Sequence, residues 1–552
     1  MPRKYHEVVP PTGVGSDIII TMYTMNLIAA RAFSTLVLAL FSTFLATLSS
    51  TAALADTILP PEVAAALARA GVPQDALSVV VVALPAATPA AALVTHVASS
   101  TTAHITTAEP VAALPANNAS PTLSPRLLHR PDVPRNPASV MKLVTTYAAL
   151  DTLGPHFTWK NRVYVDGFVG QNGQPGVLEG NLVLRGSGDP KLVLERIQDL
   201  FAQIQAKGVR EVRGDIILDR SIFNVPDKNP ADFDDEPLRP YNAAPDGLLV
   251  NFKSLIFTFT PDPANQRVLV KYEPPIAGVE IPTELPLASG NCGDWKMGLR
   301  AEFFTPNKIS FLGRYAASCG EKVWPVAYND PLSYAVRVID AMWAQAGGKL
   351  TGTVREAPMP RTSKSFLVVP SLPLSEIIAD VNKFSNNVMA QQVFLTLSSR
   401  NEPGPLHKQG SFEASRRMLA AWWKATLPNA APPVLENGSG LSRKERSSAS
   451  ALAALLLHAG SSANALVFAN SLGTAGVDGT VARMKDRNAQ SIAIGNAQLK
   501  TGTLKDVVAV AGYANSLTGQ RYVLVAIVNH PNAGAARPAL DKLVEWVVRD
   551  AR

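Results

Sequence analysis

The sequence predicts a mixed α/β fold of the α+β kind, because helical and strand-like stretches lie in separate blocks along the 552 residues. A strongly apolar helical stretch ends near residue 153, strand signals dominate the block 160–370, and helices return from residue 374. The chain then ends in a β-hairpin followed by a helix. We therefore expect one domain built from 56–159 and 371–552, with strand-rich domains inserted at 160–370.

The first 55 residues predict a secretory signal peptide. Arg31 precedes an apolar run from Ala32 to Leu48, and Ala53-Leu54-Ala55 has the small-x-small pattern of a cleavage site before Asp56. A permanent anchor helix is the alternative, which the short and Ser/Thr-dotted run disfavours.

The segment that follows begins with regular elements and then changes in composition. We expect a helix over Glu62–Ala70 and a Val-rich strand over Ser78–Leu84. Residues 85–131 are rich in Ala, Pro, Thr and Ser without periodicity, which predicts a flexible low-complexity insertion.

A buried helix is expected after this insertion. Asn136 is a good N-cap, Pro137 suits the first helical position, and Gly154-Pro155 ends the helix after Leu153. Apolar residues cover much of the helix circumference, so this helix should lie inside the domain.

The block 160–370 is predicted to consist mainly of strands, since β-branched and aromatic runs alternate with turn residues. The expected strands are Val163–Val165, Leu182–Arg185, Asp215–Leu218, Ser254–Thr260 and Arg267–Tyr272, with a helix completed by Asp340–Gly347. The acidic stretch Asp232–Glu236 is expected to be a solvated loop. A calcium site there is the alternative, but no further ligand pattern follows.

The last part of the chain is predicted to form helices around an antiparallel sheet. The expected helices are Leu374–Ser385, Val388–Leu397, Phe412–Thr426, Ala449–His458 and Ala535–Arg549. Strands Val507–Asn515 and Arg521–Asn529 flank a turn at Thr518-Gly519.

Charge and cysteine content limit the classes of partner. The net charge of +7 suits work beside an acidic polymer or loose association with a membrane surface. No basic run with interleaved aromatics indicates nucleic-acid binding, and the scattered histidines indicate no metal or cofactor. Cys292 and Cys319 predict one disulfide in an exported chain, contributing about 3–4 kcal/mol, with two buried free thiols as the alternative.

Ser139-Val140-Met141-Lys142 places a hydroxyl and an amine one helical turn apart. Ser139, near the positive end of the helix dipole, is a candidate nucleophile, but its hydroxyl needs a base to accept the proton. Lys142 is the candidate base, so burial and a nearby cation must lower its pKa. A helix-start serine beside a surface lysine is the alternative, which the apolar neighbours of Lys142 disfavour.

Ser385-Asn386-Asn387 joins two expected helices. The tripeptide pattern alone means little, because Ser289-Gly290-Asn291 and Ser462-Ala463-Asn464 share it. At this place in the chain order, Ser385 could shuttle a proton between Lys142 and a leaving nitrogen, and the Asn387 amide could hold a substrate carbonyl.

Lys500-Thr501-Gly502 occurs once, in a strand expected at a sheet edge. Gly502 would let a substrate backbone approach, and strand edges bind extended peptides. Lys500 with the hydroxyls of Thr501 and Thr503 could hold a terminal carboxylate, and Lys500 would supply the cation near Lys142. A hairpin turn is the alternative for this tripeptide taken alone.

These three motifs, in this order, are typical of serine acyl-transferases that recognise penicillin. The chain resembles the class C, type-4 low-molecular-mass penicillin-binding proteins, D-alanyl-D-alanine carboxypeptidase/endopeptidases of the DacB kind, over about residues 59–84 and 132–550. Further stretches that carry the resemblance are Asn136–Ala138, Gly186–Pro190, Pro240–Ala243, Asn437–Arg443, Ala475–Thr480 and Asn529–Pro531. Two departures are Asn437, where the family usually has Asp, and the long insertion 85–131.

The resemblance implies a transpeptidase-like catalytic domain, an antiparallel sheet flanked by helices. Two inserted domains would occupy the 243-residue gap between Lys142 and Ser385. It implies a periplasmic enzyme that cleaves peptidoglycan stem peptides through a Ser139 acyl-enzyme and is covalently inhibited by β-lactams. The backbone N–H groups of Ser139 and Thr503 would form the oxyanion hole, and His530 and Asp478 would have structural roles.

Two other functions fit the same motifs. A serine β-lactamase shares all three, although the long insertion and the absence of a recognisable deacylation glutamate disfavour it. A non-catalytic peptidoglycan-binding protein on the same fold would not need the whole set of polar residues.

Overall fold

The computed structural model describes residues 57–85, 125–170, 175–399 and 408–550. The expected signal peptide lies outside these residues, as does most of the expected low-complexity insertion.

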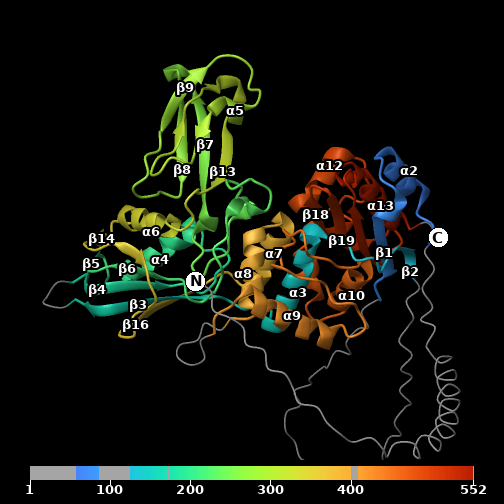
Figure 1. Cartoon of the computed structure of the whole chain (residues 1–552), viewed down its shortest axis with the longest axis horizontal. Helices are drawn as coiled ribbons and strands as arrows, with labels where there is room; N and C mark the ends of the chain where they lie inside the picture. The colour runs from blue at the N-terminus through green and yellow to red at the C-terminus, as the bar shows by residue number, and fades with distance from the viewer. Residues whose placement is uncertain (1–56, 86–124, 171–174, 400–407, 551–552) are drawn as a thin grey trace, which may run out of the picture. The chain divides into compact units, whose positions relative to one another are not determined.

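Within the described residues, a six-stranded antiparallel sheet forms the centre of a domain built from both ends of the chain (Figure 1). In spatial order its strands are β17 (Gly473–Thr474), β18 (Ala497–Leu504), β19 (Val507–Asn515), β20 (Arg521–Asn529), β1 (Leu77–Ala83) and β2 (Pro125–His129). β1 pairs with β20, with Val79 opposite Ala526, so the two ends of the chain share one ladder.

Both faces of this sheet are covered, as the apolar composition of its strands requires. In β1, Val79 and Val81 pack with the core on one side, while Val80 and Val82 pack with the core on the other. α2 (Pro61–Arg69) and α13 (Arg537–Arg549) cover the first face. The helices on the second face are α3 (Lys142–Leu153), α7 (Leu374–Phe384), α8 (Asn387–Thr396), α9 (Phe412–Thr426), α10 (Ala449–Gly460) and α11 (Ala465–Asn470).

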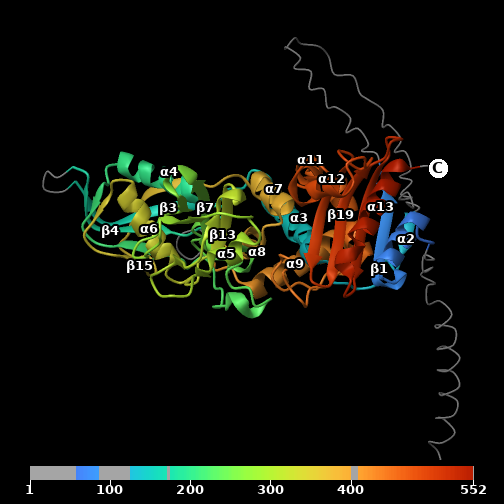
Figure 2. The same cartoon turned by 90° about the horizontal axis from the view of Figure 1, so that it is seen from above.

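Residues 160–370 carry separate sheets around one further core. The larger sheet contains β3 (Lys160–Val169), β4 (Val177–Arg185), β5 (Glu211–Val212), β6 (Ile216–Asp219), β14 (Lys349–Leu350), β15 (Val354–Glu356) and β16 (Lys364–Pro370). The other sheets contain β7 (Ser254–Asp262), β8 (Arg267–Glu273), β9 (Glu284–Ala288), β12 (Tyr315–Ala316) and β13 (Lys322–Ala327), and the pair β10 (Ala301–Glu302) and β11 (Ser310–Phe311). α4 (Leu194–Ala206), α5 (Trp295–Leu299) and α6 (Tyr334–Gln345) accompany them (Figure 2).

This block leaves and re-enters the first domain at one place. Lys160 at the start of β3 lies opposite Pro370 at the end of β16, and the Ser371 N–H donates to the Trp159 carbonyl at 2.8 Å. Neighbouring entry and exit points let a long segment be inserted without disturbing its host. We therefore propose 56–159, 160–370 and 371–552 as the parts of the chain.

One expectation about local structure was wrong, and one helix was not expected. Residues 125–129, assigned to the low-complexity insertion, form β2, because Leu127 and Leu128 pair with β1 and bury their side chains. The helix α4 was not expected; its buried positions Ile197, Leu200 and Ile204 recur at helical spacing. The helix α6 ends at Gln345, within the stretch 340–347 that was expected to complete a helix.

The acidic loop is held by its own neighbours. Asp234 accepts hydrogen bonds from the Tyr241 hydroxyl at 2.8 Å and from Asn242 Nδ2 at 2.7 Å. In the described part of the chain, no group of three or more His, Cys, Asp or Glu side chains is arranged to hold a metal ion.

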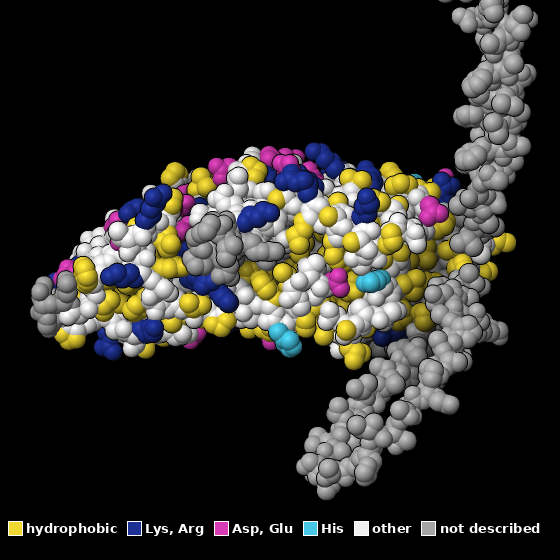
Figure 3. All heavy atoms as spheres, turned by 90° about the horizontal axis from the view of Figure 1, so that it is seen from below, with side chains coloured by type: hydrophobic (Ala, Val, Ile, Leu, Met, Phe, Trp, Pro, Cys, Tyr) yellow, Lys and Arg dark blue, Asp and Glu magenta, His cyan; other side chains and the backbone are white. Residues whose placement is uncertain are grey.

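The charged side chains on the surface and the lengths of the helices bear on the expected partners. On the face seen in Figure 3, Lys and Arg side chains lie singly or in small groups among uncharged ones. None of the helices in the described ranges has both the length and the apolar character needed to span a bilayer.

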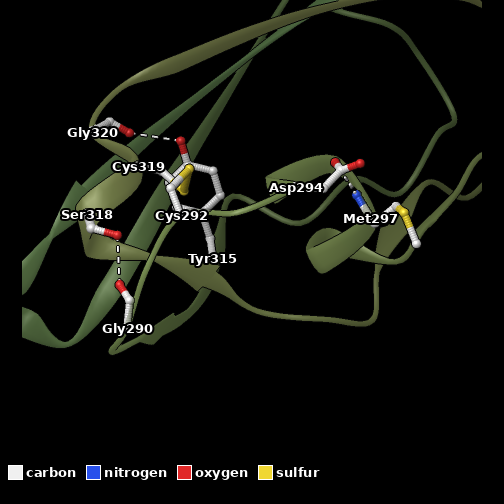
Figure 4. The surroundings of a disulfide bond; sticks show 8 residues. All are labelled: Gly290, Cys292, Asp294, Met297, Tyr315, Ser318, Cys319 and Gly320. Atoms are coloured by element: carbon white, nitrogen blue, oxygen red, sulfur yellow. Dashed lines mark hydrogen bonds between the residues drawn. A yellow bond between two sulfur atoms is a disulfide. The ribbon is translucent and has the colours of Figure 1, made fainter.

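The predicted disulfide between Cys292 and Cys319 is confirmed (Figure 4). Around it, the Ser318 hydroxyl donates to the Gly290 carbonyl at 2.7 Å and the Tyr315 hydroxyl to the Gly320 carbonyl at 2.8 Å. The crosslink closes a separation of 27 residues whose regular elements, α5, β10, β11 and β12, are all short.

Replacing both cysteines, Cys292→Ser with Cys319→Ser, should lower the free energy of unfolding of the inserted region by about 3–4 kcal/mol, because the unfolded chain regains the entropy of an open loop. Urea unfolding followed by tryptophan fluorescence measures this. Ser318→Ala removes only the neighbouring hydrogen bond and should cost about 1 kcal/mol. Equal losses in the two variants would contradict the crosslink's contribution.

Candidate active site

Ser139 lies in a short 3₁₀ turn, η3 (Ala138–Met141), that leads into α3. The regular α-helix therefore starts at Lys142, whereas it was expected to start at Pro137. The Asn136 side chain still acts as a cap: its Oδ1 accepts from the Ala138 N–H at 2.8 Å, and its Nδ2 donates to the Ser442 carbonyl at 2.8 Å. Ala138 takes the unusual φ of 48°, so this turn is tightly constrained.

Two glycines leave room for the serine turn. A Cβ at Gly440 would lie 2.0 Å from the Ala138 carbonyl oxygen, and a Cβ at Gly502 would lie 2.4 Å from that of Pro137. Gly502 was expected to make room for a substrate backbone. In the structure, the backbone that lies close to Gly502 is that of the serine turn itself. The same contact brings the backbones of Ser139 and Thr503, the predicted oxyanion donors, close together.

Lys142 is fully buried and its ammonium group is surrounded by oxygen atoms. Nζ donates to Ser139 Oγ at 2.9 Å, to Asn387 Oδ1 at 2.6 Å and to the Ser439 carbonyl. Burial, and secondly the charge of Lys500, lower the pKa of Lys142 well below its usual value, while Glu445 opposes this shift. The serine turn, the start of α8 and the loop at Ser439 thus all contact the amine of Lys142.

Lys500 is a second fully buried lysine, on β18. Its Nζ donates to Ser385 Oγ at 2.8 Å and to the Thr501 carbonyl at 2.7 Å. Burial lowers the pKa of Lys500 to about 7. Among the described residues, β18 has no partner strand on its outer side beyond Leu499, as the expected edge position requires.

The two polar residues of the Ser-x-Asn motif each contact one lysine. Ser385 follows α7 in a left-handed conformation, φ 58°, and accepts from Lys500; Asn387 begins α8 and accepts from Lys142. Ser385 was expected to be linked to Lys142, but its hydrogen bond in the structure is to Lys500. The side-chain nitrogen of Asn387, Nδ2, makes a long contact of 3.4 Å to the Tyr241 carbonyl.

The other two Ser-x-Asn copies lie elsewhere. Ser462 donates to the Ala459 carbonyl at the end of α10, and Gly290 accepts from Ser318 near the disulfide. Asp478 accepts from Lys383 Nζ at 2.7 Å and from the Thr474 N–H, which is a structural role.

Glu445 is a buried carboxylate that the sequence did not single out. Its Oε1 accepts from three successive backbone N–H groups, those of Glu436, Asn437 and Gly438, at 2.9–3.1 Å. It thereby holds the loop whose Ser439 carbonyl contacts Lys142. Burial raises the pKa of Glu445, against these hydrogen bonds and the charge of Lys142. A lone Glu in a polar stretch offers no sequence signal of this role.

Asn437, where the resembled family usually has Asp, stabilises the same loop. Its Oδ1 accepts from the N–H and hydroxyl of Ser439, and its Nδ2 donates to the Leu441 carbonyl at 3.0 Å. An amide satisfies the donor bond to Leu441, which a carboxylate could not make.

A groove of about 1190 Å³ opens in front of the serine. Its lining combines the motif residues Ser139, Ser385, Asn387 and Thr503 with side chains of the inserted region and of the Ser439 loop, among them Asp234, Tyr241, Ile256 and Arg443. Thr501, also on β18, is not part of this lining, and its hydroxyl lies 2.7 Å from the Thr480 hydroxyl. A serine hydroxyl, a buried amine and an open groove together form a site for nucleophilic acyl transfer.

Residues 122–549 match the D-Ala-D-Ala carboxypeptidase 3 (S13) family. Because the match covers most of the chain, the chain belongs to this family. It is a serine-type hydrolase of the penicillin-binding class, and the family resemblance inferred from its motifs is confirmed.

Two curated relatives share moderate identity. The chain is 23% identical over 398 residues to the D-alanyl-D-alanine carboxypeptidase DacB of Haemophilus influenzae, covering 72% of this chain and 81% of the relative. It is 27% identical over 425 residues to the D-alanyl-D-alanine carboxypeptidase of an Actinomadura species, strain R39, covering 74% and 76%.

The crystal structure of penicillin-binding protein 4 (dacB) from H. influenzae has the same fold. Its TM-score is 0.61 at 20% identity, with 76% of this chain and 93% of that chain covered. The predicted fold class, including inserted domains, is confirmed.

Gly440→Ala should destabilise the protein by about 1–3 kcal/mol more than a matched control, because the new methyl group collides with the Ala138 carbonyl and displaces the turn of Ser139. Gly495→Ala is that control: its φ of 77° matches the 79° of Gly440, but a Cβ there has no neighbour within 4 Å. Thermal unfolding compares them. Equal stability of the two variants would contradict the tight contact.

Proposed function

We propose that the protein is a D-alanyl-D-alanine carboxypeptidase/endopeptidase that acts on peptidoglycan stem peptides through an acyl-enzyme on Ser139. One observation carries the proposal: the fully buried Nζ of Lys142 lies 2.9 Å from Ser139 Oγ, beside a second buried lysine. The family and the two curated carboxypeptidase relatives support the substrate class.

Lys142 is the proposed base in acylation. A neutral amine is needed to accept the serine proton, and the lowered pKa of Lys142 favours that form. Ser139 Oγ then bonds to the carbonyl carbon of a D-Ala–D-amino acid bond, and its proton moves to Lys142 Nζ. The resulting oxyanion is held by the N–H groups of Ser139 and Thr503.

Ser385 and Lys500 are proposed to complete the step on the leaving side. When the tetrahedral intermediate collapses, the C–N bond breaks and the departing nitrogen takes a proton from Ser385. Lys500, 2.8 Å from Ser385 and with a pKa of about 7, can replace that proton. Lys142 then gives its proton to water in the groove and Lys500 takes one from it, so both lysines return to their starting states. A water molecule attacks the acyl carbon, Lys142 accepts its proton, and Lys142 passes that proton to Ser139 Oγ as the ester C–O bond breaks.

The substrate is proposed to lie along the free edge of β18. An extended peptide can pair there next to Thr503, and the groove takes the rest of the stem. Asn387 Nδ2, whose contact to the Tyr241 carbonyl is long, can donate to a carbonyl of the peptide. β-Lactams, which present a reactive carbonyl in the same place, are expected to acylate Ser139. The signal peptide expected from the sequence would place this chemistry in the periplasm.

Exposure to penicillin G should add one covalent adduct to the intact protein, and Ser139→Ala should abolish it, since Ser139 is the proposed nucleophile and lies 2.9 Å from its proposed base, Lys142 Nζ. Mass spectrometry with peptide mapping measures this. The adduct should persist for many turnover times, because Glu445, the carboxylate near Lys142, is buried and committed to three N–H groups. Rapid loss of the adduct would favour a β-lactamase instead.

Product analysis separates the enzyme from a binding protein. Monomeric muropeptides should lose D-alanine, and cross-linked dimers should be cleaved to monomers, in a manner that depends on Ser139. Binding of either compound without products would contradict the proposal.

Glu445→Gln should shift the acidic limb of the pH–rate profile of acylation to lower pH. The Glu445 charge raises the pKa of Lys142, so removing it lowers that pKa and makes the base available at lower pH. The pH dependence of penicillin acylation measures the shift. Glu436→Gln removes a charge from the same loop and should leave the limb unchanged. A limb that stays in place in Glu445→Gln would contradict Lys142 as the base.

A further inference from the structure

A second cavity of about 570 Å³ also has the nucleophile in its lining. It shares Ser139, Ser385 and Thr503 with the main groove but has separate walls. These walls are η11 (Gly479–Arg483) with α12 (Met484–Arg487) on one side, and α13 on the other. An acyl-transfer site needs space for the groups on both sides of the scissile bond, and the two cavities that share the serine offer two such spaces.

The walls of this cavity have an excess of positive charge. Arg487 is paired with Asp541 through two hydrogen bonds of 2.6 and 2.9 Å. Arg483 has no carboxylate within ion-pair distance among the described residues, and Arg537 donates only to the nearby Gly534 carbonyl at 3.2 Å. Two guanidinium groups are therefore available to a ligand that carries an anion.

Lys500 is poorly suited to bind that anion. It was expected to hold a terminal carboxylate together with Thr501 and Thr503, but it is fully buried and its Nζ points to Ser385 and to the Thr501 carbonyl. Its lowered pKa also leaves it only partly charged at neutral pH. The Thr501 and Thr480 hydroxyls, 2.7 Å apart, do line this second cavity.

We propose that this cavity is the subsite for the leaving group, in which Arg483 and Arg537, with the Thr501 and Thr480 hydroxyls, bind the carboxylate of the departing D-amino acid. Guanidinium groups match carboxylates in geometry and remain charged at all relevant pH values. This inference rests on the proposed function, since it assumes that Ser139 attacks the bond next to that residue.

The cavity has room for more than alanine. Its volume lies within the range of about 300–1,000 Å³ that accommodates whole small ligands. Apolar side chains, including Met484, Leu540 and Val544, form much of its lining. The subsite should therefore accept D-amino acids with large side chains, provided that they keep the carboxylate.

The test compares peptides that end in D-Ala–D-Ala with a free carboxylate and with a C-terminal amide. In Arg483→Ala, kcat/KM for the carboxylate should fall about 10- to 100-fold, the value of a hydrogen bond to a charged group, and kcat/KM for the amide less than about 2-fold. Arg483→Lys should recover part of the loss. Lys485→Ala, an exposed neighbour on α12 outside the cavity, should behave like the wild type.

The outcomes separate the subsite from the proposed function. If the wild type hydrolyses neither peptide, the proposed function fails. If the wild type is active and Arg483→Ala loses nothing, or loses equally on both peptides, the subsite is wrong. Arg537→Ala, on the opposite wall, repeats the test should Arg483→Ala fold poorly. A wild type that cannot release a C-terminal D-Phe would overturn the inference about size.

Discussion

The burial of Lys142 is the constraint on which the rest of the site depends. An ammonium group without water is costly, and it is tolerated here because Ser139, Asn387 and the Ser439 carbonyl surround it. These three partners come from the serine turn, from α8 and from a distant loop, so the lysine cannot be buried correctly unless all three segments are in place. The same burial lowers its pKa, and the packing of the fold and the reactivity of the amine are therefore set together.

The loop that contacts Lys142 shows how much of the fold serves this position. Glu445 collects three backbone N–H groups, Asn437 fixes Ser439, and Gly440 makes room for the Ala138 carbonyl. None of these three residues lies in one of the short motifs that define the family's chemistry. They act on the backbone around the motifs, which is why a small change at Gly440 should affect Ser139.

The inserted region contributes to the groove without supplying the reacting groups. The junction at Trp159 and Ser371 allows the block 160–370 to enter and leave at neighbouring strands, and side chains such as Tyr241 then reach the groove. The long separation between Lys142 and Ser385 is thus compatible with a compact site. The nucleophile lines both this groove and the arginine-walled cavity, so the acyl and leaving sides of the proposed reaction have different surroundings.

The sequence by itself determined most elements, the three motifs, the disulfide and the family, because apolar periodicity, turn residues and short motifs are local signals. The tertiary structure alone decided which hydroxyl each lysine contacts, and it shows that Ser385 is hydrogen-bonded to Lys500 and not to Lys142. It also revealed β2, the role of Glu445 and the cavity with Arg483 and Arg537. These depend on contacts between residues far apart in the chain, and spacing within one segment carries no information about them.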